Sequence, residues 1–129
     1  MKLLLDTCVF LWWMGDSDKL SSRALNAIRS SEARVHLSAA SAWEISVKRP
    51  MGRLNLPAPT KDFIPNACTN QDISLLPISP LEAMAAGELP QHHKDPFDRM
   101  LIALAMGEAD MLLVSPDQAF RAYDVNLLW

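Results

Sequence analysis

The stretch "KLLLD", residues 2–6, decides how this chain folds, because it is a short apolar run that ends abruptly on an aspartate. Apolar runs of four to eight residues bounded by polar ones are typical of parallel strands that are buried on both faces. Runs of the same form recur along the chain; they are "VHLSA" at 35–39, "MLLVS" at 111–115 and, more weakly, "ISLLPI" at 73–78 and the closing "VNLLW" at 125–129. The sequence therefore predicts four to five short strands spread over its length.

Helical patterns lie between these runs. Segments with apolar residues at helical spacing are "SSRALNAIRSSE" at 21–32, "SAWEISVKR" at 41–49, "PLEAMAAGEL" at 80–89 and "PFDRMLIALAMGEA" at 96–109. A loop rich in proline and glycine leads into one more helix near 63–69. Strands that alternate with helices are joined by right-handed crossovers. We therefore expect a mostly parallel sheet that is covered by helices on both faces.

Length and composition narrow the class of protein. The 129 residues, of which 50% are hydrophobic and 21% charged, fit one globular domain. A net charge of −3 argues against a protein that coats nucleic acid by bulk positive charge. Cys8 and Cys68 form neither a metal-binding pattern nor a disulfide framework. No apolar run reaches the roughly 20 residues that span a bilayer, and no targeting segment is evident, so a cytoplasmic protein is expected.

Four acidic residues fall where strands end or helices begin. Asp6 ends the first strand, Asp117 follows the strand at 111–115, and Asp98 lies in the first turn of the long helix. Glu44 is expected in the first turn of the helix that follows the second strand. In an open parallel sheet these ends share one edge, where ligands usually bind. The four carboxylates are therefore expected to converge.

A purely structural interpretation of these acids remains open. "SAWE" at 41–44 has the form of a capping box, and "DPFD" at 95–98 places Asp95 at the N-cap of the following helix. "SPLE" at 79–82 is a third such pattern and is assigned wholly to capping. Asp6 is harder to explain in this way, because aspartate is a poor strand former, although an Asx-turn remains an alternative.

Chemistry favours a metal site if the acids do converge. Neighbouring carboxylates repel each other, so at pH 7 they share protons or bind a cation. Because no histidine or cysteine stands at ligand spacing, the all-oxygen set favours Mg²⁺ or Mn²⁺ over zinc. Such ions activate water and stabilise the charge that develops when a phosphodiester is hydrolysed. Among the histidines, His36 is expected to be structural, and His92 and His93 to be exposed on a loop.

Other α/β classes fit less well. A phosphoacceptor receiver domain needs an aspartate after a central strand, and neither the strand at 35–39 nor the one at 73–78 supplies it. No GxGxxG follows a strand, which disfavours a dinucleotide enzyme. A hydrolase of the haloacid-dehalogenase type would carry a second aspartate two residues after the first, in the place of the cysteine of "DTCV". A binding module without catalysis remains an alternative, and it predicts no response to metal.

Several longer pieces together resemble a known family. They are "LLLDT" at 3–7, "SAASAWEISVK" at 38–48, "GRLNLP" at 52–57, "LPQHHKDPFDRMLIALA" at 89–105, "LLVSPD" at 112–117 and "LLW" at 127–129. In this order they resemble the PIN-domain nucleases and, within them, the VapC-type toxins of bacterial toxin–antitoxin pairs. The resemblance implies a single PIN domain over residues 1–129, a three-layer α/β/α sandwich, and ribonuclease activity that depends on Mg²⁺ or Mn²⁺.

The resemblance also implies particular residues and partners. The catalytic and metal-binding acids of the family fall on Asp6, Glu44, Asp98 and Asp117.

Residues next to these acids that could support them or contact substrate are Thr7, Asp95, Ser115, Lys48, Arg53 and Arg99. The tryptophans Trp12, Trp13 and Trp43 are expected to pack in the core or at an interface. The implied partners are an RNA substrate, a small antitoxin protein and a second copy of the chain, with no membrane.

Overall fold

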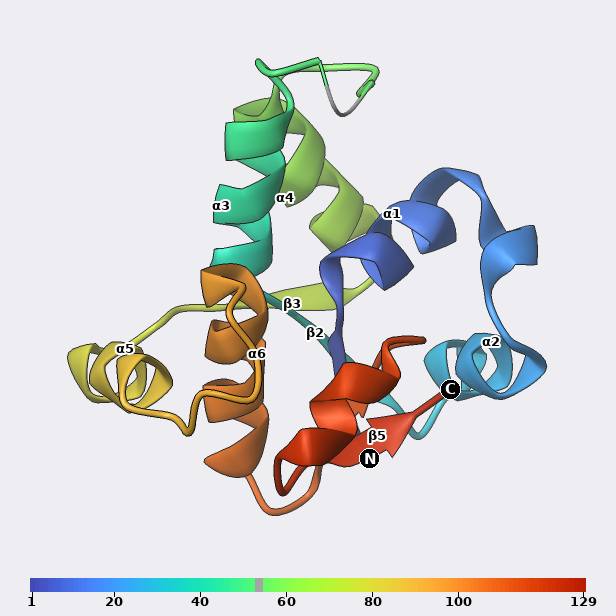
Figure 1. The fold of residues 1–129 in the computed structure, drawn as a ribbon. Coiled ribbons are helices and arrows are strands. Elements are labelled where there is room, and N and C mark those ends of the chain that lie inside the picture. Colours follow the sequence, from blue (N-terminus) through green and yellow to red (C-terminus); the bar gives the residue numbers. More distant parts are fainter. Residues whose placement is uncertain (53–54) are drawn as a thin grey trace.

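A computed structural model describes residues 1–52 and 55–129, and its centre is a five-stranded sheet in which every neighbouring pair is parallel. The strands run in the order β3-β2-β1-β4-β5 (Figure 1). Their bounds are Lys2–Leu5 for β1, Arg34–Ser38 for β2, Ile73–Leu76 for β3, Met111–Val114 for β4 and Asn126–Leu128 for β5. The predicted α/β architecture with a parallel sheet is confirmed.

The central strand β1 explains why its sequence is a continuous apolar run. Leu3 and Leu5 pack into one core cluster, while Leu4 packs into a second cluster on the opposite face of the sheet. All three side chains have no exposed surface. Burial on both faces removes the alternation of polar and apolar residues that marks a strand with one wet face.

Helices cover both faces. The cluster around Leu3 and Leu5 takes apolar residues from α1, α2, α3 and α4, which span Thr7–Gly15, Ser22–Arg29, Ala39–Lys48 and Thr60–Asn70. The cluster around Leu4 takes them mainly from α6, Pro96–Met106, against which α5, Pro80–Gly87, packs. Short 3₁₀ helices, η1 at Ser17–Lys19 and η2 at Gln118–Ala122, complete the described chain. Within the described residues no helix is long and apolar enough to cross a membrane.

The helix starts confirm two of the three capping predictions. Ser79 and Glu82 form the predicted capping box of α5, and Asp95 is the N-cap of α6, where its side chain accepts the Phe97 N–H at 2.9 Å. The prediction for "SAWE" is wrong, because α3 already begins at Ala39 with Ser38 as its N-cap. Glu44 therefore lies in the second turn of α3, where a carboxylate has no capping role.

Candidate active site

The four predicted acids meet at the edge of the sheet where β1 and β4 end. Asp6 follows β1, Asp117 follows β4, Asp98 lies in the first turn of α6 and Glu44 projects from α3. Together they line one cavity of about 540 Å³. The other lining residues are Thr7, Cys8, Leu11, Lys48, Asp95 and Pro116. Segments that are far apart in the sequence therefore meet in one acidic pocket.

Asp6 is held by hydrogen bonds that reach across to the next strand. It occupies the N-cap position of α1, but its side chain makes no capping bond. Instead, the Ser115 hydroxyl donates to Oδ2 of Asp6 at 2.6 Å and accepts the Asp117 N–H at 3.0 Å. Nearby, the Thr7 hydroxyl donates to Oγ of Ser41 at 2.9 Å, which ties α1 to α3. The structure thus places Thr7 and Ser115 beside the acids, as the sequence suggested.

Two acids of the pocket have raised pKa values. Burial raises the pKa of Asp98 to about 8, and the negative charges of Asp6, Asp95, Glu44 and Asp117 add to the rise. Burial also raises the pKa of Asp6, although the hydrogen bond from Ser115 opposes the rise. Burial and the neighbouring carboxylates therefore disfavour the ionised forms of both acids. The four carboxylates offer only oxygen ligands, and this donor set fits a hard divalent cation.

Lys48 and Cys8 line the pocket with different chemistry. Lys48 forms an ion pair with Glu44 one helical turn earlier, so its ammonium faces the acids. Burial and the nearby Asp6 raise the pKa of the Cys8 thiol to about 12. The thiol therefore stays protonated and is a poor metal ligand or nucleophile.

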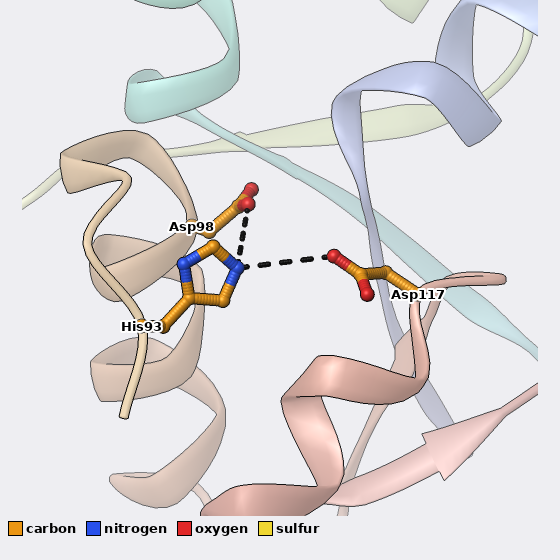
Figure 2. A group of neighbouring side chains, drawn as sticks. All are labelled: His93, Asp98 and Asp117. Atoms are coloured by element: carbon orange, nitrogen blue, oxygen red, sulfur yellow. Dashed lines mark ion pairs between the residues drawn. The ribbon is translucent and has the colours of Figure 1, made fainter. Parts of the chain in front are cut away.

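Sequence reasoning missed His93, which was expected to be an exposed loop residue. Figure 2 shows its ring between Asp98 and Asp117, with Nε2 lying 3.1 Å from Oδ2 of Asp98 and 3.8 Å from Oδ2 of Asp117. One ring nitrogen and one oxygen from each acid lie within 4.8 Å of one another. The expectation that no histidine approaches the acids is therefore wrong. The stretch "HHKDPFD" held the signal, since it puts His93 five residues before Asp98.

Arg99, predicted to support the acids or contact substrate, binds the backbone of its own chain. Its side chain is buried, and its two terminal nitrogens donate to four backbone carbonyls at 2.9–3.1 Å. Those carbonyls belong to Gly87, Leu89, Pro90 and His93. The arginine thus anchors the segment that leads into α6, which runs beside that helix in Figure 1. Arg53, the other predicted basic contact, lies outside the described residues.

Trp12 and Trp13 pack against the core as expected, whereas Trp43 lies mostly at the surface. Trp12 contacts Trp129 with ring centroids 6.0 Å apart, and the Trp13 indole N–H donates to the Gln71 side chain at 3.1 Å. Trp43 is 56% exposed, and its ring lies edge-to-face with the ring of Phe97, with centroids 4.8 Å apart. Trp43 is therefore the most accessible of the three to a partner molecule.

The structure is an α/β domain in which a parallel sheet lies between helix layers and carboxylates gather at the strand ends. Comparisons with known proteins place it in a family with this architecture. The model of the PIN domain family matches residues 3–126. A relative named Ribonuclease VapC22, from Mycobacterium tuberculosis, is 28% identical over 122 residues, which are 94% of this chain and 91% of that protein. The chain belongs to the PIN-domain family.

The fold is also similar to that of a solved structure. A chain from the crystal structure of VapBC2 of Rickettsia felis, bound to a DNA fragment from their promoter, superposes with a TM-score of 0.71. The match covers 98% of this chain and 97% of that chain at 12% identity. The resemblance to the PIN family is thus confirmed in both sequence and fold.

Proposed function

We propose that this protein is an endoribonuclease that depends on a divalent cation and acts as the toxin of a toxin–antitoxin pair. The observation that carries the proposal is the convergence of Asp6, Glu44, Asp98 and Asp117 in one cavity of a PIN-family chain. The raised pKa values of Asp6 and Asp98 support it, because buried carboxylates beside one another are stabilised in their ionised forms by a bound cation.

The four carboxylates would hold Mg²⁺ or Mn²⁺, which prefer oxygen ligands. When bound, the cation supplies Lewis acidity for the attack of water on a phosphodiester. The Ser115 hydroxyl donates to the carboxylate of Asp6 at 2.6 Å and so orients it for this purpose. Thr7 adds a hydroxyl at the cavity wall, and Asp95 orients the first turn of α6.

Lys48 has a separate part in the proposal. Its ammonium pairs with Glu44 and lines the cavity, so it stands where the phosphate of a bound RNA would lie. With Glu44 engaged by a cation, Lys48 would be available to pair with a phosphate oxygen. Such a contact adds affinity without sequence preference.

The names of the relatives support the biological part of the proposal. One is called a ribonuclease, and the structural neighbour comes from a VapBC2 complex. We infer that the substrate is RNA, that the partner is a small antitoxin protein, and that the chain forms a homodimer and works as a single domain in the cytoplasm. The alternative, a binding module without catalysis, would leave the acids with structural roles alone.

Cleavage of RNA tests the proposal. Purified protein without antitoxin is incubated with a mixed single-stranded RNA in Mg²⁺, Mn²⁺ or EDTA, beside Asp6→Asn. Asp62→Asn is the matched control, since Asp62 is an exposed acid in the first turn of α4. We expect cleavage with metal in the wild type and the control, and none in EDTA or in Asp6→Asn. If RNA stays intact under every condition, the binding module is the better account.

A further inference from the structure

We propose that His93 is a positioning residue of this site: its Nε2 faces Asp98 at 3.1 Å and Asp117 at 3.8 Å, and its positive polarity keeps both carboxylates turned toward the cavity without itself binding the cation. The inference rests on the proposed metal dependence. Several contacts fix the position of the His93 imidazole, and the proposed binding of a cation by the four acids does not explain them.

The backbone of His93 is held from two sides. The Tyr123 hydroxyl accepts the N–H groups of His92 and His93 at 3.1 and 2.9 Å and donates to the Pro90 carbonyl at 2.6 Å. From the other side, the buried Arg99 guanidinium donates to the His93 carbonyl at 3.1 Å. A loop would otherwise be free to move, so these bonds fix where the histidine side chain begins.

The ring is fixed as well. It packs against Phe120 with centroids 5.8 Å apart, and the Asp95 N–H donates to its Nδ1 at 3.3 Å. Because Nδ1 acts as an acceptor, the proton of the neutral ring resides on Nε2. A protonated Nε2 has no lone pair for a metal ion. The nitrogen that faces the acids is therefore a donor of positive polarity and not a ligand.

The two carboxylates that it faces come from different elements. Asp98 belongs to α6, whereas Asp117 lies after β4 with a side chain that is 44% exposed. Both acids are among the described residues that line the cavity, whereas His93 is not. The imidazole therefore joins them from outside the cavity, which is how groups that orient metal ligands usually act.

Two substitutions of His93 separate the two ring nitrogens. In His93→Gln the side-chain amide N–H₂ reaches the place of Nε2, so a donor remains for the acids. In His93→Asn the shorter amide reaches only the place of Nδ1, so the bond from Asp95 remains and the donor to the acids is lost. His92→Asn is the matched control, because His92 is exposed and its ring contacts Tyr123.

The test measures Mg²⁺ binding by calorimetry and Mn²⁺ binding by the loss of the free-ion electron paramagnetic resonance signal, on variants whose circular dichroism matches the wild type. We expect His93→Asn to weaken both ions by about tenfold or more and to leave the ratio of their affinities unchanged. His93→Gln should stay within about threefold of the wild type, and His92→Asn should be unaffected.

Three results would overturn the inference, each in a different way. If His93→Asn loses Mn²⁺ far more than Mg²⁺, His93 is itself a ligand, because imidazole prefers Mn²⁺ to Mg²⁺. If His93→Asn binds both ions as the wild type does, or if His93→Gln is as weak as His93→Asn, the donor does not position the acids. If the wild type binds neither ion, the proposed metal dependence fails first and this inference falls with it.

Discussion

Replacing the Asp98 carboxylate by an amide should make the metal-free protein more stable. The carboxylate is partly buried among Asp6, Asp95, Glu44 and Asp117, and its pKa is raised to about 8. In the unfolded chain the same group ionises near its usual value of 3.8. At neutral pH the folded group is therefore mostly protonated, and unfolding releases its proton, which favours the unfolded chain; Asp98→Asn removes that driving force.

The size of the effect follows from the shift. Each pKa unit is worth about 1.4 kcal/mol, so at pH 7 the shift between 3.8 and about 8 corresponds to roughly 4 kcal/mol. The amide loses a favourable interaction with the α6 dipole of about 0.3–1 kcal/mol and still buries polar atoms. We expect a net gain of about 1–3 kcal/mol, which raises Tm by about 3–10 °C for a domain of this size.

The assay is thermal unfolding in EDTA between pH 5 and pH 8.5, followed by circular dichroism. Because the folded-state pKa lies above the unfolded one, the contribution of Asp98 to stability is present at low pH and is lost as the pH rises toward 8. The gain from Asp98→Asn should therefore grow over this interval. Asp62→Asn, which changes an exposed acid at the same position of α4, should show no such growth. An Asp98→Asn protein that is no more stable than the wild type at pH 7.5 would refute the reasoning.

Further predictions follow from the same contacts. Mg²⁺ or Mn²⁺ should raise the Tm of the wild type more at pH 8 than at pH 6, because Asp98 then binds the cation without losing a proton, and should not raise that of Asp6→Asn; an equal rise in both proteins would contradict this. His36→Leu should raise the free energy of unfolding by about 1 kcal/mol in urea melts, because both ring nitrogens are buried without a partner in the described chain; a loss of stability would contradict it. Tyr123→Phe should lower the free energy of unfolding by about 1–3 kcal/mol, because two N–H groups and one carbonyl lose their partner. The same urea melts check this, and an unchanged midpoint would speak against a role in anchoring His93.

Local patterns were enough to predict the sheet and three of the acids in their places. "KLLLD" and "MLLVS" are buried on both faces, and this environment leaves a continuous apolar run in the sequence. Since parallel strands end at a common edge, the positions of Asp6 and Asp117 followed from those of the strands. "DPFD" gave the start of α6 because a proline at the first helical position leaves little choice.

The features that the sequence did not predict depend on contacts between distant residues. The start of α3 was misplaced because Ser38 and Ser41 are both acceptable caps by type, and only the packing of the helix selects the first. His93 faces the acids because Tyr123 and Arg99 fix its loop, and no local pattern contains those bonds. Arg99 was expected to support the acids or contact substrate, because nothing nearby in the sequence shows that four carbonyls surround its guanidinium.

The most direct test of the account is the initial rate of single-stranded RNA cleavage as a function of Mn²⁺ concentration, compared with Mn²⁺ binding to the same preparation. If the acidic cavity is the active site, the rate is zero in EDTA and rises with a midpoint that matches the measured Kd. Asp6→Asn should lose binding and cleavage together. A rate that persists in EDTA, or an Asp6→Asn protein that cleaves as fast as the wild type, would contradict the assignment of the cavity.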